Sequence, residues 1–181
     1  MPQFFDVSHK TQPTHTRLRS FGRAGILLHS TEGINSLAWL QGNDPTQVDV
    51  ASADFLINRL GDIYQLTSRQ HHAYHVGVAE WHGLRNDRSL LNELLVGIEM
   101  ESHETNQPRY TDLQLISCAA LCRRLMAQHL FGVLNIEYHR FVARPIGRRS
   151  DPVNFPLYVW SKELLQPSQL DPALVFPAVL P

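Results

Sequence analysis

The chain contains only two cysteines, Cys118 and Cys122, among its 181 residues. They lie four positions apart in a segment whose apolar residues recur with helical spacing, so both fall on one face of a predicted helix. A disulfide between them would constrain almost nothing, and free cysteines are usually buried. We interpret the pair as core thiols, with metal ligation as the less favoured alternative. The sequence therefore has no disulfide framework, and it leaves the redox compartment open.

Long apolar runs are also missing. No segment approaches the roughly 18 apolar residues of a membrane-spanning helix. Residues 1–6 lack a basic region followed by an apolar stretch, so no signal peptide is expected. These absences predict a protein that is cytoplasmic as made and has no integral membrane association.

An excess of charge of either sign is absent as well. The formal net charge of −1 excludes a global field that would attract nucleic acid or an anionic membrane. The basic residues at 140–149 form a local patch only. Histidine, by contrast, is abundant: the ten histidines raise the expectation of metal or proton-transfer chemistry.

The apolar pattern predicts an α/β fold with a central mixed β-sheet flanked by helices. The expected elements are strands at 24–29 and 94–100, a β-hairpin from 53–58 and 63–67, an extended segment at 71–78, a short helix at 34–41, and a helix at 111–130 with Thr111 as N-cap and Gly132 as its stop. The length suits one domain. We expect a polar, irregular N-terminal arm at 1–22, the domain at 23–160, and a C-terminal extension at 161–181 that packs on it and starts with a short helix at 161–165.

His29, His139 and Asp151 are candidate metal ligands. His29 ends a predicted buried strand, a position favoured for site residues, and Asp151 follows His139 by twelve residues. Each residue alone is more readily explained as a structural histidine or as a turn aspartate before proline. Together they supply the two imidazoles and the carboxylate of an open zinc site, in which three protein ligands leave the fourth position to water.

Glu99 interrupts the apolar segment 94–100, where a carboxylate is costly unless it is paired or faces a site. It is either an edge-strand glutamate that points to solvent or a general base beside the metal. Arg148 and Arg149 are either solvated loop cations or an electrostatic clamp for a developing oxyanion. Arg149, two residues before Asp151, is the preferred candidate, although the sequence leaves open which of the two faces the site.

Three further residues, His75, Trp81 and Asn92, are candidate substrate contacts. The alternative for His75 is a hydrogen-bonded strand histidine. Trp81 and Trp39 could line a groove for sugar or peptide, but packing in the core is the favoured alternative for both.

Five short motifs, in this order, resemble those of the zinc-dependent type 2 N-acetylmuramoyl-L-alanine amidases. That family includes phage endolysins, cytoplasmic anhydro-muropeptide amidases and animal peptidoglycan-recognition proteins. The resemblance covers about residues 22–155. The matching segments are residues 25–31, which end the strand of His29; the hairpin 52–66; residues 74–78, similar to a Trp-His-Ala-Gly element; residues 96–101, similar to an Ile-Gly-Ile-Glu strand; and His139 with residues 147–152.

Three positions depart from the family pattern. Asp54 stands where the family usually has histidine, Arg149 where it usually has lysine, and Val153 where a glycine commonly follows the Asp-Pro pair. The last departure puts the local turn in doubt.

The resemblance implies a type 2 amidase or peptidoglycan-recognition-protein-like fold, with residues 23–160 as the catalytic domain. It implies hydrolysis of the amide that joins the lactyl group of N-acetylmuramic acid to L-alanine of the stem peptide. In this view His29, His139 and Asp151 hold Zn²⁺, Glu99 transfers protons, and Arg149 stabilises the oxyanion. His75 is expected beside the substrate.

The resemblance also implies peptidoglycan or a muropeptide as the partner, and it leaves the oligomeric state open. A lytic endolysin that reaches the wall through a holin or a similar route is the favoured role, because the residues outside 23–160 look like local extensions of a bare catalytic domain. The alternatives are a cytoplasmic anhydro-muropeptide amidase of cell-wall recycling and a non-catalytic peptidoglycan-binding module. The presence of Glu99 and Asp151 argues against the last of these.

Overall fold

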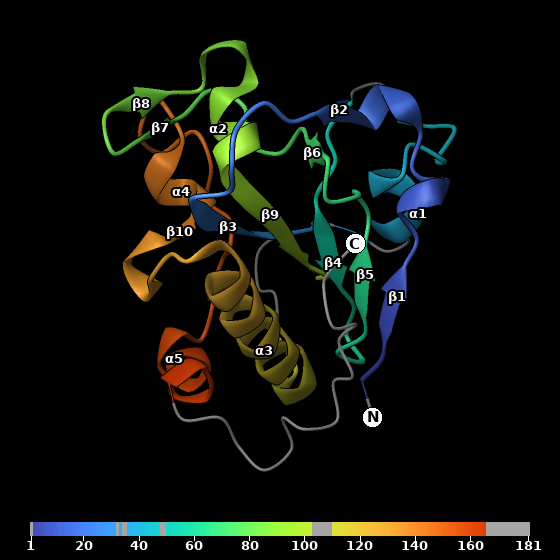
Figure 1. The fold of residues 1–181 in the computed structure, drawn as a ribbon. Helices are drawn as coiled ribbons and strands as arrows, with labels where there is room; N and C mark the ends of the chain where they lie inside the picture. Colours follow the sequence, from blue (N-terminus) through green and yellow to red (C-terminus); the bar gives the residue numbers. More distant parts are fainter. Residues whose placement is uncertain (1, 32, 34–35, 48–49, 103–109, 166–181) are drawn as a thin grey trace.

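The central sheet is mixed, as the sequence predicts. The structure, a computed structural model, describes residues 2–31, 33, 36–47, 50–102 and 110–165. Within them the main sheet has the strand order β1-β5-β4-β9-β3-β10 (Figure 1). Its strands are β1 (Phe4–Asp6), β3 (Gly25–Ser30), β4 (Phe55–Ile57), β5 (Ile63–Gln65), β9 (Leu95–Met100) and β10 (Ile136–Tyr138). The β4–β5 pair is antiparallel, and each of the other neighbouring pairs is parallel.

Two adjacent inner strands, β3 and β9, are the longest in this sheet and position the site. They pair in parallel from Gly25 opposite Leu95 to Ser30 opposite Met100. All six residues of β3 are buried. Continuous apolar sequence is typical of a parallel strand that is covered on both faces, which explains why neither segment shows simple alternation.

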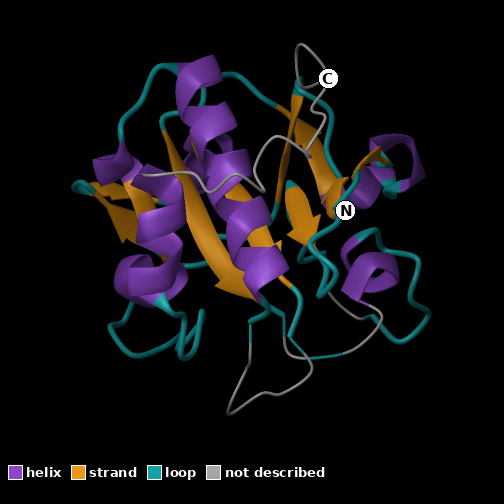
Figure 2. Ribbon diagram, turned by 90° about the horizontal axis from the view of Figure 1, so that it is seen from below, coloured by secondary structure: helices purple, strands orange, loops and turns teal. Residues whose placement is uncertain are grey.

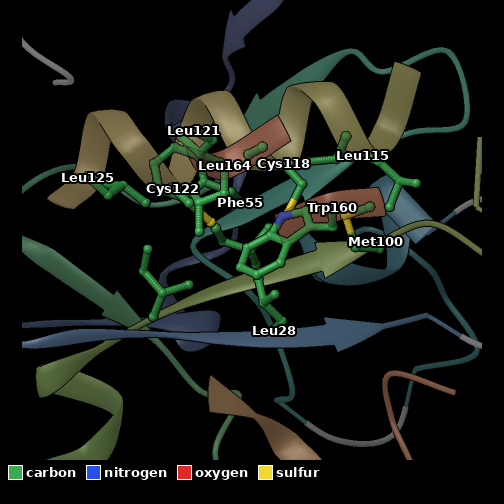
Figure 3. Packing of buried hydrophobic residues seen from close by; sticks show 14 of the residues in the cluster. Leu28, Phe55, Met100, Leu115, Cys118, Leu121, Cys122, Leu125, Trp160 and Leu164 are labelled. Carbon is green, nitrogen blue, oxygen red and sulfur yellow. The ribbon is translucent and has the colours of Figure 1, made fainter. Parts of the chain in front are cut away.

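One face of the sheet is covered by α3 (Asp112–His129) and α5 (Leu157–Leu165). Figure 2 shows helices lying across this face of the strands, and Figure 3 shows the α3 side chains directed toward the sheet, with the Trp160 ring among them. Cys118 and Cys122 are free thiols buried in this core. The prediction that they are core residues is confirmed.

The ends of α3 show one correct and one wrong prediction. Thr111 is the N-cap: its hydroxyl accepts a hydrogen bond from the Gln114 N–H, and the Gln114 side chain accepts one from the Thr111 N–H. This reciprocal capping box satisfies two N–H groups that the helix leaves unpaired. The helix ends at His129, however, because Leu130 turns the chain in the left-handed conformation (φ 59°) before Gly132 is reached.

The opposite face of the sheet carries a second apolar cluster and the smaller elements. These are α2 (Leu90–Leu94), α4 (His139–Val142) and the pair β7 (Glu80–Trp81) and β8 (Leu84–Arg85). Leu27 of β3 and Leu95 of β9 contribute to this cluster. Toward the carboxyl ends of the same two strands the apolar cluster gives way to polar side chains. In sheets with parallel strands, ligands bind at this end.

Residues 1–22 are not the irregular arm that was expected. β1 lies parallel to β5 at the edge of the main sheet, and β2 (Thr16–Leu18) pairs with β6 (His71–Ala73). These strands are three residues long, and each pairs with a segment far away in the sequence. Such pairing leaves no pattern in the local sequence, so the polar composition of residues 1–22 predicted irregular structure instead. The expected extended segment at 71–78 is reduced to β6.

The remaining predictions match in part. The hairpin is confirmed by the antiparallel β4–β5 pair. The short helix α1 covers Ser36–Leu40, and residues 34–35 of its predicted span lie outside the described residues. α5 begins at Leu157 and so crosses the predicted boundary at 160; the rest of the predicted extension, residues 166–181, lies outside the described part of the chain. None of the helices in the described ranges is long and apolar enough to cross a membrane.

Candidate metal centre

The structure brings His29, His139 and Asp151 together. His29 lies near the end of β3, and His139 begins α4 directly after β10, which pairs with β3 so that Tyr138 is opposite Leu28. The His29 Nδ1 lies 3.0 Å from the His139 Nδ1 and 3.2 Å from the Asp151 Oδ2, and the latter two atoms are 3.1 Å apart. A hydrogen bond from the backbone N–H of Arg140 to the carbonyl oxygen of Asp151 (2.9 Å) holds Asp151 against α4.

This triangle of donor atoms fits a divalent ion. Around a tetrahedral ion with bonds of about 2.0–2.1 Å, ligand atoms lie roughly 3.3 Å apart, close to the separations observed here. Among the described residues, these three form a group of histidine and carboxylate side chains that could hold a metal ion. Two imidazoles and one carboxylate are the donor set of catalytic zinc.

The protonation states of the triangle also suit a metal. Burial, followed by repulsion from His139, lowers the pKa of His29 to about 4. Burial alone would raise the pKa of the Asp151 carboxyl, but the close contacts with the imidazoles of His139 and His29 outweigh it and hold that pKa well below its usual range. At neutral pH the site therefore presents a neutral His29 and an ionised Asp151, as metal ligation requires.

Glu99 lies beside this triangle because of the strand register. Its Cα is paired with that of His29 across β3 and β9. Neighbouring residues in register on parallel strands project from the same face of the sheet, and both side chains line one cavity. A carboxylate in this position can exchange protons with a water molecule that occupies the cavity.

The two arginines differ in what they contact. Arg148 donates through Nε to the Arg144 carbonyl oxygen (2.9 Å) and through Nη2 to that of Val78 (2.8 Å). Arg149 is an exposed residue that lines the cavity of His29 and Glu99. Arg149 therefore lines the cavity, whereas Arg148 bonds backbone carbonyl groups of two loops; the role of Arg149 toward an oxyanion stays a prediction.

The cavity has a volume of about 370 Å³, and both polar and apolar side chains line it. Trp39 of α1 lines it and also packs against a small apolar cluster around Leu40, so the core packing favoured from the sequence is confirmed in part. Half-buried Asp44, in the loop after α1, adds a carboxylate to the lining. The full lining comprises His29, Ser30, Thr31, Gly33, Ser36, Trp39, Leu40, Asp44, Ala51, Ser52, His75, Glu99, His139, Arg149 and Asp151.

Of the three predicted substrate contacts, one lines the cavity and two do not. Trp81 is only 6% exposed and packs in the second apolar cluster, away from the cavity lining. Asn92 is buried beneath the site, where its Oδ1 accepts hydrogen bonds from the backbone N–H groups of His75 and Val76. His75 reaches the cavity wall but is 8% exposed, with its ring behind that of His29. Trp81 and Asn92 are therefore not part of the cavity lining, and contact between His75 and a substrate stays a prediction.

A buried ion pair behind the site was missed. Arg23 Nη2 lies 2.6 Å from Asp54 Oδ1, and the two side chains are 6% and 1% exposed. Asp54 also accepts hydrogen bonds from the Thr67 hydroxyl (2.6 Å) and the Gly97 N–H (2.9 Å). The sequence contained a signal for this pair, because each charge adjoins or interrupts an apolar strand, where an unpaired charge is strongly unfavourable.

Tyr110 is a second residue near the site that was not predicted from the sequence. Burial raises the pKa of its hydroxyl to about 12, so the group stays protonated. It donates to the Val153 carbonyl oxygen at 3.1 Å. This bond anchors the segment after Asp151 at the position where valine replaces the usual glycine.

Comparisons with known proteins agree with this geometry. The sequence profile of a family described as N-acetylmuramoyl-L-alanine amidase (Amidase_2) matches residues 22–154. The chain is 32% identical over 111 residues to the 1,6-anhydro-N-acetylmuramyl-L-alanine amidase AmpD of Enterobacter cloacae, a match that covers 61% of this chain and 54% of the relative. The chain thus spans about half the length of the curated relatives it matches.

Solved structures show the same fold. A selenomethionine derivative of AmpD superposes with a TM-score of 0.73 at 23% identity, covering 89% of this chain and 94% of that one. The N-acetylmuramoyl-L-alanine amidase LysC from Clostridium intestinale URNW gives a TM-score of 0.64 at 20% identity and covers 91% of this chain and 99% of that one. The mixed sheet with flanking helices is the architecture of these proteins.

Proposed function

This chain belongs to the N-acetylmuramoyl-L-alanine amidase family Amidase_2, and we propose that it hydrolyses the amide between N-acetylmuramic acid and L-alanine with the help of zinc. The observation that carries the proposal is the triangle of His29, His139 and Asp151 beside Glu99. Its donor atoms are 3.0–3.2 Å apart, and the carboxylate of Glu99 lines the same cavity.

The residues that line the cavity have different roles in the proposed reaction. A bound zinc ion would polarise the scissile carbonyl and make water a better nucleophile near neutral pH. Glu99 accepts the proton of the attacking water and delivers it to the leaving amine. Arg149 faces the negative charge that develops on the carbonyl oxygen, and it stays cationic throughout because arginine does not deprotonate.

The names of the curated relatives favour a soluble substrate. Those relatives are amidases of 1,6-anhydro-N-acetylmuramyl-L-alanine, so we propose an anhydro-muropeptide as the preferred substrate of this chain. This choice reverses the order of the two roles considered from the sequence, in which a lytic endolysin came first. Lytic action on polymeric peptidoglycan remains the competing hypothesis.

One pair of assays tests the proposal. Purified protein is incubated with a soluble anhydro-muropeptide and, separately, with intact sacculi, and the released peptide is identified by mass spectrometry. Faster release from the soluble fragment supports the proposed substrate, whereas faster release from sacculi supports the lytic role.

Metal analysis of the same preparation tests the mechanism. The expected result is about one zinc per chain and loss of peptide release after chelation, with recovery on adding zinc. Tight muropeptide binding with neither zinc nor product would contradict the proposal and indicate a recognition module.

A further inference from the structure

The same short segment, His75–Val76, contacts the Nε2 atoms of both histidines of the metal triangle. The His29 Nε2 lies 3.0 Å from the His75 Nδ1. The His139 Nε2 lies 3.0 Å from the Val76 carbonyl oxygen. Adjacent residues of one loop therefore contact the far side of both imidazoles, although they are 46 and 63 positions from them in sequence.

The acceptors in this arrangement determine which nitrogen carries each proton. A carbonyl oxygen only accepts, so the Val76 carbonyl requires a proton on the His139 Nε2 and leaves its Nδ1 bare. The His75 Nε2 lies 3.2 Å from the Leu95 carbonyl oxygen and must likewise donate. The His75 Nδ1 is then an acceptor, so the His29 Nε2 donates to it. Both Nδ1 atoms of the metal triangle are thus free of protons and available to a metal.

The segment itself is held by a dedicated set of contacts. The Asn92 Oδ1 accepts from the N–H groups of both His75 (3.0 Å) and Val76 (2.9 Å). Gly97 leaves room for the imidazole of His75, because a Cβ at that position would lie 2.6–2.7 Å from three of its ring atoms. The Asp54 Oδ2 lies 3.8 Å from the His75 Nε2. The other carboxylate oxygen of Asp54 is held by the ion pair with Arg23.

We propose that His75–Val76, clamped by Asn92, is a positioning element that selects Nδ1 of both His29 and His139 as the metal-binding atoms. His75 is then a positioning residue and not a substrate contact, since both of its ring nitrogens are engaged. The inference rests on the proposed function for the presence of a metal. Partners of this kind fix the tautomer and orientation of ligating histidines, and their loss typically weakens metal binding by about 10- to 100-fold.

Substitutions at His75 distinguish the contributions of its two ring nitrogens, Nδ1 and Nε2. The Oδ1 of asparagine occupies nearly the place of the histidine Nδ1, so His75→Asn keeps an acceptor for His29. His75→Gln keeps a donor toward Leu95 but loses that acceptor, and His75→Leu loses both. His72→Leu is the matched control, because His72 is a buried histidine of β6 whose Nδ1 lies 3.0 Å from the carbonyl oxygen of its own neighbour, Ala73.

The first measurement is the zinc affinity of each folded, metal-stripped protein by competition with a chelating dye. We expect binding about 10- to 100-fold weaker in His75→Leu and His75→Gln, and a change of only a few-fold in His75→Asn and His72→Leu. Equal weakening in all four variants, or in none, would overturn the inference.

The second measurement is independent of zinc and of activity. Nitrogen-15 NMR of the metal-free wild type is expected to show His29 and His139 protonated at Nε2, and His29 to lose this single tautomer in His75→Leu. A His29 tautomer unchanged in that variant would contradict the inference while leaving the amidase proposal intact. A wild type with the expected tautomers that binds no zinc would instead contradict the proposed function and leave only the control of the tautomers by His75 and Val76 intact.

Discussion

His29 and Glu99 are register partners on two adjacent parallel strands, so their side chains leave the same face of the sheet at the same level. The residues one step earlier, Leu28 and Ile98, are also partners and lie on the opposite face in the α3 core. A slip of one residue in the pairing would send either polar side chain into that core. The register of β3 and β9 therefore fixes the distance between a candidate ligand and the candidate base.

Glu99→Gln should separate metal binding from catalysis. The amide keeps the shape of the side chain but cannot accept the proton of the attacking water, so we expect peptide release to fall by about 10²- to 10⁴-fold. Zinc content should remain near that of the wild type, because Glu99 is not a member of the ligand triangle. Activity assays and elemental analysis on one preparation provide the test, and full activity in this variant would remove Glu99 from the mechanism.

Arg149→Ala and Arg148→Ala form a matched pair. Loss of Arg149 should lower kcat by about 10²-fold, as expected when one group that stabilises an oxyanion is removed, and Arg149→Lys should recover part of it. Loss of Arg148 should leave kcat much less affected but lower the melting temperature, because Arg148 bonds two loop carbonyl groups. Steady-state kinetics that show the reverse order would exchange the two roles.

The buried pair of Arg23 and Asp54 should be sensitive to removal of one partner. Asp54→Leu or Arg23→Leu leaves an unpaired charge in the interior, and we expect each to lower the free energy of unfolding by about 3–5 kcal/mol. The double variant should be less destabilised than the sum of the two. Urea denaturation measures these differences, and simple additivity would show that the pair does not act as a unit.

Acid should destabilise the metal-free protein in a defined window. Burial lowers the pKa of His29 from 6.5 to about 4 in the folded state, so between these values the unfolded chain binds more protons than the folded chain. Stability must then fall as pH drops from about 6.5 toward 4, by as much as roughly 3 kcal/mol from this residue. Burial also lowers the pKa of His72, His75 and His129, which adds in the same direction.

Urea denaturation with a chelator at pH 7, 6 and 5 checks this expectation, and His29→Asn serves as its control. The variant should show a shallower loss of stability between pH 7 and pH 5, because it lacks one of the contributing imidazoles. Identical slopes in the two proteins would contradict the assignment of part of the effect to His29.

Local chemistry explains what could be predicted without coordinates. The apolar run that ends in His29, the periodicity of residues 111–130 and the N-cap residue Thr111 are all short-range signals. The candidate ligands and Glu99 were found because a histidine or carboxylate at the end of an apolar strand is costly unless it serves a site. These features depend on neighbours along the chain, and the sequence displays such neighbours directly.

Tertiary structure decided the features that depend on partners distant in sequence. Asn92 and His75 look like candidate ligand contacts as residue types, yet their hydrogen bonds turn them inward, toward the backbone and toward His29. The edge strand β1 and the ion pair of Arg23 with Asp54 likewise arise only when strands assemble. Residue type determines what a side chain is able to bind, whereas strand register and packing determine which groups it meets, because a hydrogen bond forms only where the fold brings donor and acceptor to about 3 Å.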